Sequence, residues 1–210
     1  MKGAIFDLDG TLLDSMGVWR QIDVDFLARR GLQVPEDYME AISHLSFKEA
    51  ADYTIRRFGF KEMPEEIIDE WMQMAKEAYA HRIMAKKGAY AYLEKLNREG
   101  VHIGAATSCD PALFLPCLKN RGLLDYFETI VTAKEVKRGK GFPDIYERTA
   151  EQMGLSPAEC TVYEDIYQGV KGAQMGGFTV IGILDPTSEY EWDKIRELAD
   201  QTIISFEELL

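Results

Sequence analysis

The first apolar segment of the chain ends in two closely spaced carboxylates. Residues 4–6 are Ala-Ile-Phe, and Asp7 and Asp9 follow them with a single residue between. On extended backbone, residues i and i+2 lie on the same side, so these two acidic side chains lie close together. Charges are rarely left at the end of a buried strand unless a cation or a reaction uses them. The segment therefore predicts a metal ion or a catalytic carboxylate pair, with a structural turn as the alternative.

The charge of the chain excludes one class of function. It has 24 lysines and arginines and 36 aspartates and glutamates, so the formal net charge is −12. A nucleic-acid binder needs a basic face, and no nucleic-acid partner is expected. An anionic substrate would have to be attracted by a local metal ion or lysine. The length of 210 residues suits one large domain, or one domain with a smaller insert.

The cysteines and the N-terminal residues favour a cytoplasmic location. Cys109, Cys117 and Cys160 lack the spacing of a zinc site and are interpreted as free thiols in a reducing compartment. The sequence enters the acidic strand directly after Met1, which leaves no room for a signal peptide. No apolar run approaches the roughly 18 residues of a membrane span, so no membrane partner is expected. The sequence does not predict an oligomeric state.

Hydrophobic spacing predicts the fold class. Residues 1–14 have the pattern of a strand and its turn, residues 15–83 show only helical periodicity, and helical and β-rich segments alternate over 84–210. Within the helical zone, Ser46 and Glu49 have the spacing of a capping box. Alternating segments indicate βαβ units and hence a parallel sheet with helices on both faces. We therefore expect an α/β core domain, residues 1–14 and 84–210, with an inserted helical cap domain, residues 15–83.

Polar side chains come at the carboxyl ends of the predicted strands, where open parallel sheets bind their ligands. The β-rich runs after the first are 101–106, 129–131, 161–163 and 178–181. Carboxylates, small hydroxyls and one lysine are delivered to this edge: Asp7, Asp9, Thr11, Thr107, Ser108, Lys140, Glu164 and Asp165. Hard oxygen ligands hold Mg²⁺, and hydroxyl, backbone N–H and ammonium groups hold phosphate oxygens. The edge therefore suits Mg²⁺ and a phosphoryl group.

These residues form four motifs, and with them the chain resembles the haloacid dehalogenase superfamily of aspartate-nucleophile hydrolases. The first motif is Asp7-Leu8-Asp9-Gly10-Thr11-Leu12-Leu13-Asp14-Ser15, and the second is Thr107-Ser108. The third is Lys140 with Pro143-Asp144-Ile145-Tyr146, and the fourth is Val162-Tyr163-Glu164-Asp165, followed by Gly169 and Ala173. The resemblance covers residues 1–14 and 88–184. It is closest to the group of phosphatases and β-phosphoglucomutase-like enzymes with a helical cap. It implies a Rossmann-like, doubly wound core with the cap inserted after the first strand.

The resemblance also implies a role for each matching residue. Asp7 would be the nucleophile that forms an aspartyl phosphate, and Asp9 would protonate the leaving oxygen and then activate water. Thr11 would position Asp9 through its hydroxyl. The groups that bind phosphoryl oxygens would be the Thr107 side chain, the Ser108 backbone and Lys140. The Mg²⁺ ligands would be Asp7, the backbone carbonyl of Asp9, Asp165 and Glu164.

Taken singly, most of these motifs also have a structural interpretation. Thr107-Ser108 alone would serve as a helix N-cap, and Glu164-Asp165 alone would suit a solvated loop or a helix N-terminus. Lys140 alone would be a surface lysine. Its spacing to Pro143-Asp144 matches the family and favours it over Lys137. The order of all four motifs favours the catalytic interpretation.

Asp9 decides which reaction is expected. A halide leaves unprotonated, whereas a leaving alkoxide needs a proton, so a carboxyl at this position favours phosphoryl transfer. Thr107-Ser108 is followed by Cys109-Asp110 instead of a lysine, and Phe47 stands where the mutases have a cap arginine. An acidic residue would weaken binding of a second phosphate. We therefore expect a phosphatase of a small phosphomonoester, such as a sugar phosphate. A β-phosphoglucomutase-like mutase is the alternative, and a non-catalytic binding protein is a third.

Substrate specificity is expected to come from the insert. The candidate residues are Met16, Trp19, His44 and Phe47, with packing inside the cap as the alternative for each. A further apolar stripe, Trp71, Met74 and Ala78, has helical spacing and is interpreted as cap core. The sequence does not predict which phosphorylated metabolite is the substrate.

Overall fold

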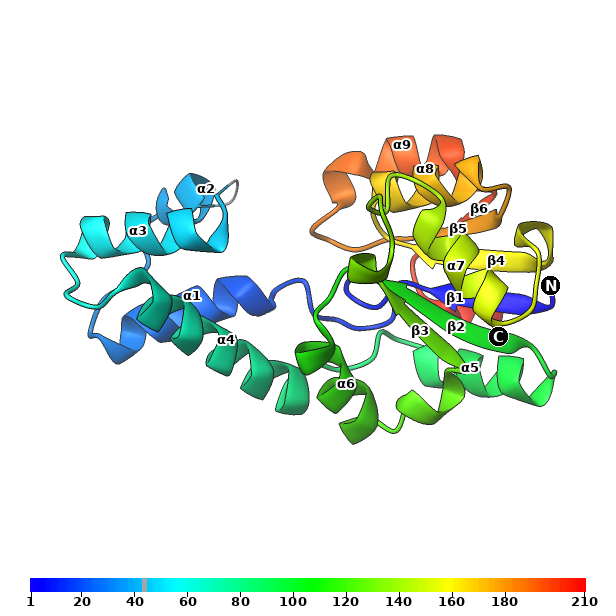
Figure 1. Cartoon of the computed structure of the whole chain (residues 1–210), viewed down its shortest axis with the longest axis horizontal. Helices are drawn as coiled ribbons and strands as arrows, with labels where there is room; N and C mark the ends of the chain where they lie inside the picture. The colour runs from blue at the N-terminus through cyan, green and yellow to red at the C-terminus, as the bar shows by residue number, and fades with distance from the viewer. Residues whose placement is uncertain (43–44) are drawn as a thin grey trace. The chain divides into compact units, whose positions relative to one another are not determined.

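The structure is a computed structural model, and it describes residues 1–42 and 45–210. The chain forms two compact units, which Figure 1 shows coloured along the sequence. Met1–Met16 and Ile83–Leu210 make up the first, called the core unit below. Gly17–Arg82 makes up the second, called the helical unit.

A parallel sheet lies at the centre of the core unit. Its strands are β1 (Gly3–Phe6), β2 (His102–Thr107), β3 (Thr129–Thr132), β4 (Cys160–Glu164), β5 (Thr179–Ile183) and β6 (Gln201–Ile203). They are hydrogen-bonded in the order β3-β2-β1-β4-β5-β6 (Figure 1). Strand β1 therefore lies between β2 and β4, at the point where the direction of the connections reverses. Ligand sites of open α/β sheets lie at such switch points. The predicted parallel α/β fold is confirmed.

Helices cover both faces of this sheet. The helices are α5 (Ala89–Arg98), α6 (Pro111–Asn120), α7 (Asp144–Gln152), α8 (Tyr167–Met175) and α9 (Trp192–Leu198). Ile5 and Val162 belong to a buried cluster that includes residues of α7, α8 and α9. Their neighbours Phe6 and Tyr163 point to the other face, where their rings stack at 4.4 Å and approach Tyr92 of α5. This alternation is the period of two that a strand buried on both faces requires.

The two connections between the core and helical units run side by side within the core unit. The backbone N–H of Asp14 donates to the carbonyl of Met84 at 2.9 Å, and that of Lys86 donates to the carbonyl of Leu12 at 2.8 Å. Leu13 and Ala85 form an antiparallel bridge between them. The side chain of Lys86 pairs with the buried carboxylate of Asp185, just beyond β5. The outgoing and returning segments are thereby held to each other and to the sheet.

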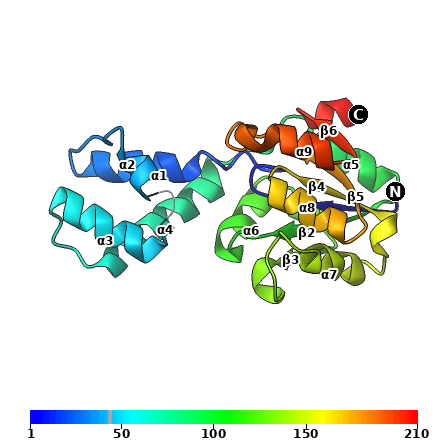
Figure 2. The ribbon, with the colours of Figure 1, turned by 90° about the horizontal axis from the view of Figure 1, so that it is seen from above.

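The helical unit contains α1 (Val18–Arg29), α2 (Tyr38–Ile42), α3 (Phe47–Phe58) and α4 (Pro64–His81), which Figure 2 shows from above. The predicted capping box at Ser46 and Glu49 is confirmed at the start of α3. The stripe of Trp71, Met74 and Ala78 is buried, as predicted. No helix in the described part of the chain combines the length and the apolar composition that a bilayer span requires.

Several elements of the core unit were not expected from the sequence. They are α9 and β6, together with the short 3-10 helices η1 (Leu124–Tyr126), η2 (Ala133–Glu135), η3 (Pro157–Glu159), η4 (Glu189–Glu191) and η5 (Phe206–Leu209). Strand β6 has only three residues, and its first two are Gln201 and Thr202. A short edge strand of polar composition has no recognisable β pattern in the sequence. It forms a strand because it pairs with β5.

Candidate active site

The backbone after β1 is fixed by hydrogen bonds on both sides of the turn. The N–H of Asp7 donates to the carbonyl of Tyr163 at 3.0 Å, which extends the pairing with β4 past the end of β1. The N–H groups of Leu12 and Leu13 both donate to the carbonyl of Leu8, at 2.9 and 2.8 Å. Asp7 is therefore held in place by the sheet, and the turn that follows brings Thr11 back toward β4.

Three carboxylates meet at this edge of the sheet. Asp7 follows β1, Glu164 ends β4 and Asp165 follows it, and one oxygen of each lies within 4.8 Å of the others. All three are buried, with exposed fractions of 5%, 0% and 1%. The sequence prediction that these motifs converge rests on the common edge of adjacent parallel strands. Here the pairing of β1 with β4 brings them together.

Lys140 neutralises part of this charge. Its Nζ contacts Oδ1 of Asp7 and lies 2.6 Å from Oε1 of Glu164. The hydroxyl of Tyr146 on α7 donates to the same Oε1 at 2.8 Å. When all three carboxylates are ionised, the single ammonium leaves two negative charges in a buried cluster. Buried charge of this kind is strongly unfavourable unless it is compensated, so the cluster is suited to bind a divalent cation.

Burial and mutual repulsion shift the pKa values of these groups. Burial raises the pKa of Asp7 well above its usual range, and Glu164 and Asp165 raise it further, although Lys140 opposes the shift. Burial and the charge of Glu164 raise the pKa of Asp165 to about 7. Burial alone would lower the pKa of Lys140, but Asp7 and Glu164 outweigh it, and the net pKa is raised. Lys140 is therefore a permanent cation, and the carboxylates need a second one.

Two buried oxygen atoms in the cluster are without a hydrogen-bond partner in the described residues. They are Oδ2 of Asp165 and Oε2 of Glu164. Buried carboxylate oxygens are normally satisfied, and an unpaired one costs free energy. Because both belong to residues of the acidic cluster, these oxygens are suitable ligand atoms for a hard cation. The donor set contains only oxygen, which fits Mg²⁺.

Gly10 makes room for this cluster. Its φ of +82° lies in the left-handed region. A Cβ added here would lie 2.2 Å from Oδ2 of Asp165, closer than real Cβ atoms approach. Glycine is therefore required both by the turn and by the space that Asp165 occupies.

We expect Gly10→Ala to reduce both stability and metal affinity. The positive φ alone costs about 1 kcal/mol for a residue with a Cβ, and the clash would push Asp165 out of the cluster. Urea unfolding with and without Mg²⁺ would measure both effects. Gly31→Ala is a matched control, because Gly31 also has a positive φ but no atom lies within 4 Å of an added Cβ. An equal loss of metal affinity in both variants would contradict this explanation.

The structure gives Thr11 and Ser15 separate partners. The Thr11 hydroxyl, predicted to position Asp9, donates to Oδ1 of Asp165 at 3.0 Å. The Ser15 hydroxyl donates to Oδ1 of Asp9 at 2.5 Å. Thr11 thus supports a predicted metal ligand, and Ser15 helps to orient the partly buried Asp9. Ser15 was not predicted as a site residue, although it is the last residue of the first motif.

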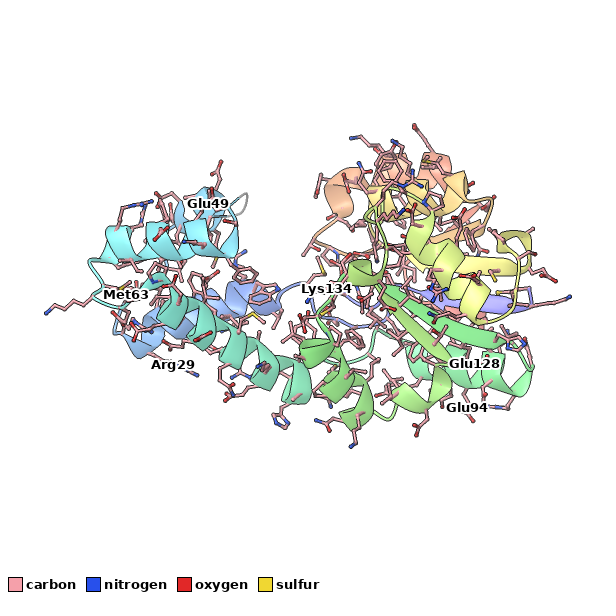
Figure 3. The ribbon with its side chains drawn as sticks, viewed as in Figure 1. Arg29, Glu49, Met63, Glu94, Glu128 and Lys134 are labelled. Atoms are coloured by element: carbon pink, nitrogen blue, oxygen red, sulfur yellow. The ribbon has the colours of Figure 1, made fainter. Side chains whose placement is uncertain are left out.

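The second motif lies at the end of β2. Thr107 is buried, and its Oγ1 accepts a hydrogen bond from the N–H of Cys109 at 3.0 Å, whereas Ser108 is exposed. Asp110 is the N-cap of α6 and accepts from the N–H of Ala112 at 2.9 Å. Its other oxygen pairs at 2.7 Å with Lys134, which Figure 3 labels beyond β3. The charge of Asp110 is therefore compensated, which weakens the sequence argument against a second phosphate.

The predicted specificity residues fall in different units. Met16 is 37% exposed and belongs to the core unit. Trp19 and Phe47 belong to the helical unit, where their rings meet edge to face at 5.2 Å. His44 lies outside the described residues. Their roles in specificity stay predictions.

Sequence reasoning gave no role to Tyr146 of the third motif, which is fully buried against Glu164. A tyrosine in the apolar stripe of a helix has the pattern of an ordinary core residue. Its position three residues after Pro143 could have indicated that it faces the same edge as Lys140. Packing of α7 against the sheet is what brings its hydroxyl to the acidic cluster.

Comparison with known proteins places this arrangement in a family. The family model of haloacid dehalogenase-like hydrolases matches residues 4–183. Hexitol phosphatase A of Escherichia coli (strain K12) is 34% identical over 187 residues, 88% of this chain and 84% of that protein. β-Phosphoglucomutase of Bacillus subtilis (strain 168) is 27% identical over 199 residues, 87% of this chain and 83% of that protein.

A solved structure gives the same result for the fold. The crystal structure of a HAD family hydrolase from Deinococcus radiodurans R1, with bound phosphate and sodium, is 27% identical and has a TM-score of 0.77. It covers 100% of this chain and 93% of the solved chain. The resemblance predicted from the four motifs is confirmed, as is the Rossmann-like fold. The chain belongs to the haloacid dehalogenase-like hydrolase family.

Proposed function

We propose that the protein is a Mg²⁺-dependent phosphatase that hydrolyses a small phosphomonoester, such as a sugar phosphate. The observation that carries the proposal is the buried contact of Lys140 with Asp7, beside two further carboxylates. A nucleophilic carboxylate next to a fixed ammonium and a cation site suits an electrophile that carries negative charge. The named hexitol phosphatase relative, 34% identical, supports a phosphorylated carbohydrate or a similar metabolite as substrate.

The chemistry divides between Asp7 and Asp9. Oδ of Asp7 attacks phosphorus, the bond to the leaving oxygen breaks, and an aspartyl phosphate forms. Asp9 donates its proton to the leaving alkoxide and then removes a proton from the water that hydrolyses the intermediate. Ser15 holds the Asp9 carboxylate at 2.5 Å. Asp9 is less buried than Asp7, which suits a group that must exchange protons with the leaving oxygen and with water.

The remaining residues stabilise the transferring group. Lys140 compensates charge on Asp7 and on the phosphoryl oxygens, which bear more negative charge as the reaction proceeds. The Thr107 hydroxyl and the Ser108 N–H donate hydrogen bonds to the other phosphoryl oxygens. Asp7, Asp165, Glu164 and the Asp9 carbonyl would hold Mg²⁺. When bound, Mg²⁺ supplies charge neutralisation at the phosphoryl group. Tyr146 keeps Glu164 in its rotamer by donating to Oε1.

The helical unit is proposed to act as a cap that supplies substrate specificity. Its chain leaves and re-enters the core unit beside the turn that carries Asp9. Exclusion of water from the site is the usual reason for such a cap in phosphoryl transfer. We propose a cytoplasmic location, in keeping with the free thiols of the chain.

Hydrolysis of p-nitrophenyl phosphate tests the proposal. We expect Mg²⁺-dependent release of p-nitrophenol, a loss of at least about 100-fold in rate on chelation with EDTA, and recovery when Mg²⁺ is restored. A rate that does not respond to EDTA would contradict the metal site. No hydrolysis by the folded wild-type protein at saturating Mg²⁺ would contradict the phosphatase itself.

A sugar-phosphate mutase is the second candidate, and the pairing of Asp110 with Lys134 is the observation that keeps it in consideration. The test compares release of inorganic phosphate with formation of an isomeric sugar phosphate from the same substrate. We expect phosphate release to be the faster process. A mutase rate that exceeds phosphate release would overturn the assignment as a phosphatase.

A further inference from the structure

A pocket within the helical unit contains a buried carboxyl group that the proposed reaction does not use. The cavity has a volume of about 450 Å³ and lies among α1, α2, α3 and α4. Asp23 of α1 is part of its wall and is only 8% exposed. Because every lining residue in the described part of the chain belongs to the helical unit, the pocket is a feature of that unit alone.

Aromatic rings form much of the wall around this carboxyl. Trp19 and Phe47 both line the cavity and meet edge to face at 5.2 Å. Trp71 lines it from α4, and its indole N–H is buried without a hydrogen-bond partner in the described residues. The rest of the lining is mostly aliphatic, including Ile22 and Ala50. A polyol would leave most of its hydroxyl groups unpaired against such a wall.

Asp23 has no cation beside it in the described part of the chain. Arg20 also lines the cavity, but its side chain is exposed and forms no ion pair with Asp23. Burial raises the pKa of Asp23 to about 7. A buried carboxyl without a partner is unfavourable for folding, and a bound cation would remove this cost. The pocket therefore combines a carboxylate acceptor with faces of aromatic rings, the two groups that recognise organic ammonium ions.

We propose that this pocket binds an organic ammonium ion, whose charge pairs with Asp23 and whose apolar body packs against Trp19, Phe47 and Trp71. The ammonium donates to the Asp23 carboxylate, and the rings contact the carbon atoms next to it. Binding of a free amine does not depend on the proposed phosphatase activity, because the described lining residues all belong to the helical unit, whereas an amine-bearing substrate rests on the proposed function. The group is either an amine-bearing part of the substrate or a free amine.

Isothermal calorimetry on the full chain at pH 8 tests the pocket with phenethylamine and its neutral analogue 2-phenylethanol. We expect the amine to bind at least about tenfold more tightly than the alcohol, since one compensated charge is the only difference. Equal dissociation constants would overturn the proposal. So would tighter binding of phenylacetate that is lost in Arg20→Gln, because that outcome would identify an anion site.

Asp23→Asn removes the charge of the side chain and keeps its size, so it tests the contribution of charge apart from that of pocket shape. In this variant we expect the amine to lose its advantage over the alcohol, whose affinity stays unchanged. Asp69→Asn, on an exposed carboxylate of α4, is the matched control and should leave both affinities unchanged. Thermal unfolding at pH 8 should show Asp23→Asn to be no less stable than the wild type, since a buried charge is removed. Retention of the amine preference in folded Asp23→Asn would overturn the proposal.

The pH dependence supplies an independent readout. Between pH 8 and pH 6, Asp23 gains a proton and the amine should bind several-fold more weakly, while the alcohol does not respond. Phenethylamine stays protonated in this range. Among the described residues, the other ionisable groups near Asp23 are Arg20 on the same helix and Tyr38 of α2, whose pKa burial raises to about 12. Neither of these two groups changes charge between pH 6 and 8, and the same titration of Asp23→Asn shows which part of the response belongs to Asp23. A flat amine affinity would overturn the assignment.

To distinguish the two sources of the amine, the phosphatase assay uses phosphomonoesters of an amino alcohol and of the matching neutral alcohol. If the amine is part of the substrate, Asp23→Asn should raise KM for the amino ester at least about fivefold and leave the neutral ester unchanged. If it is a free ligand, KM is unaffected and only the calorimetric binding is lost. Loss of hydrolysis of both esters alike would indicate damage to the fold and would overturn the role of Asp23 in recognition.

Discussion

Asp7→Asn is expected to lower kcat for p-nitrophenyl phosphate by about 10⁴-fold or more, because the amide cannot form the aspartyl phosphate. Its backbone N–H would still donate to Tyr163, so the turn should keep its geometry. Burial and the neighbouring carboxylates make the Asp7 charge unfavourable in the absence of metal. We therefore expect the metal-free variant to be as stable as the wild type or more stable, even though it is inactive. Steady-state kinetics and urea unfolding measure the two effects.

Loss of activity together with unchanged stability would show that Asp7 acts in catalysis and is not needed for folding. Asp14→Asn is the matched control, because Asp14 is an exposed carboxylate of the same motif. It should retain nearly full activity. If Asp7→Asn kept as much activity as Asp14→Asn, the assignment of the nucleophile would be wrong. If Asp7→Asn were much less stable without metal, its inactivity would have a structural cause instead.

Lys140→Met is expected to reduce both activity and stability. The side chain is 8% exposed and contacts two buried carboxylates. Its removal leaves three carboxylates in the cluster without any cation, which costs about 3 kcal/mol of folding free energy. Loss of a cation at the phosphoryl group should also lower kcat/KM by about 10³-fold. Denaturant unfolding and the phosphatase assay would measure these changes.

Unfolding with and without Mg²⁺ tests whether the effect of Lys140→Met arises at a cation site. With all three carboxylates ionised, the uncompensated charge rises from two to three in Lys140→Met, so Mg²⁺ should raise its unfolding midpoint more than it raises that of the wild type. Lys137→Met, on the neighbouring exposed lysine, should behave like the wild type. An equal response to Mg²⁺ in all three proteins would show that the cation does not bind at the acidic cluster.

The sequence was sufficient to predict that Asp7, Lys140 and the Glu164-Asp165 pair gather at one edge of the sheet, but not how these residues contact one another. Asp7 and Asp165 could be placed together because the carboxyl ends of parallel strands share an edge. The contact of Lys140 with Glu164 depends on how the loop before α7 folds against β4, and nothing in the local pattern describes that. Thr11 illustrates the same limit, since its hydroxyl lies against Asp165 after the turn has formed.

The helical unit was predicted as a set of helices, but its pocket was not. Asp23 follows Trp19 by four residues and precedes Phe26 by three, so it lies on the apolar face of α1. A charged residue in that stripe was a signal that sequence reasoning could have used. Whether it faces a cavity or an ion-pair partner depends on the packing of α2, α3 and α4, which only the structure supplies.

The paired connections at Leu12–Asp14 and Met84–Lys86 make the helical unit an exchangeable module. The two segments that join the units lie next to each other on the core unit. A different insert with closely spaced ends could therefore replace residues 17–82 without disrupting the strand pairing of the sheet. Lys86 and Asp185 would hold the junction in either protein. A chimaera of this kind could combine the same reaction with a new substrate range, and diversification within such a fold needs no change at the sheet edge that performs the chemistry.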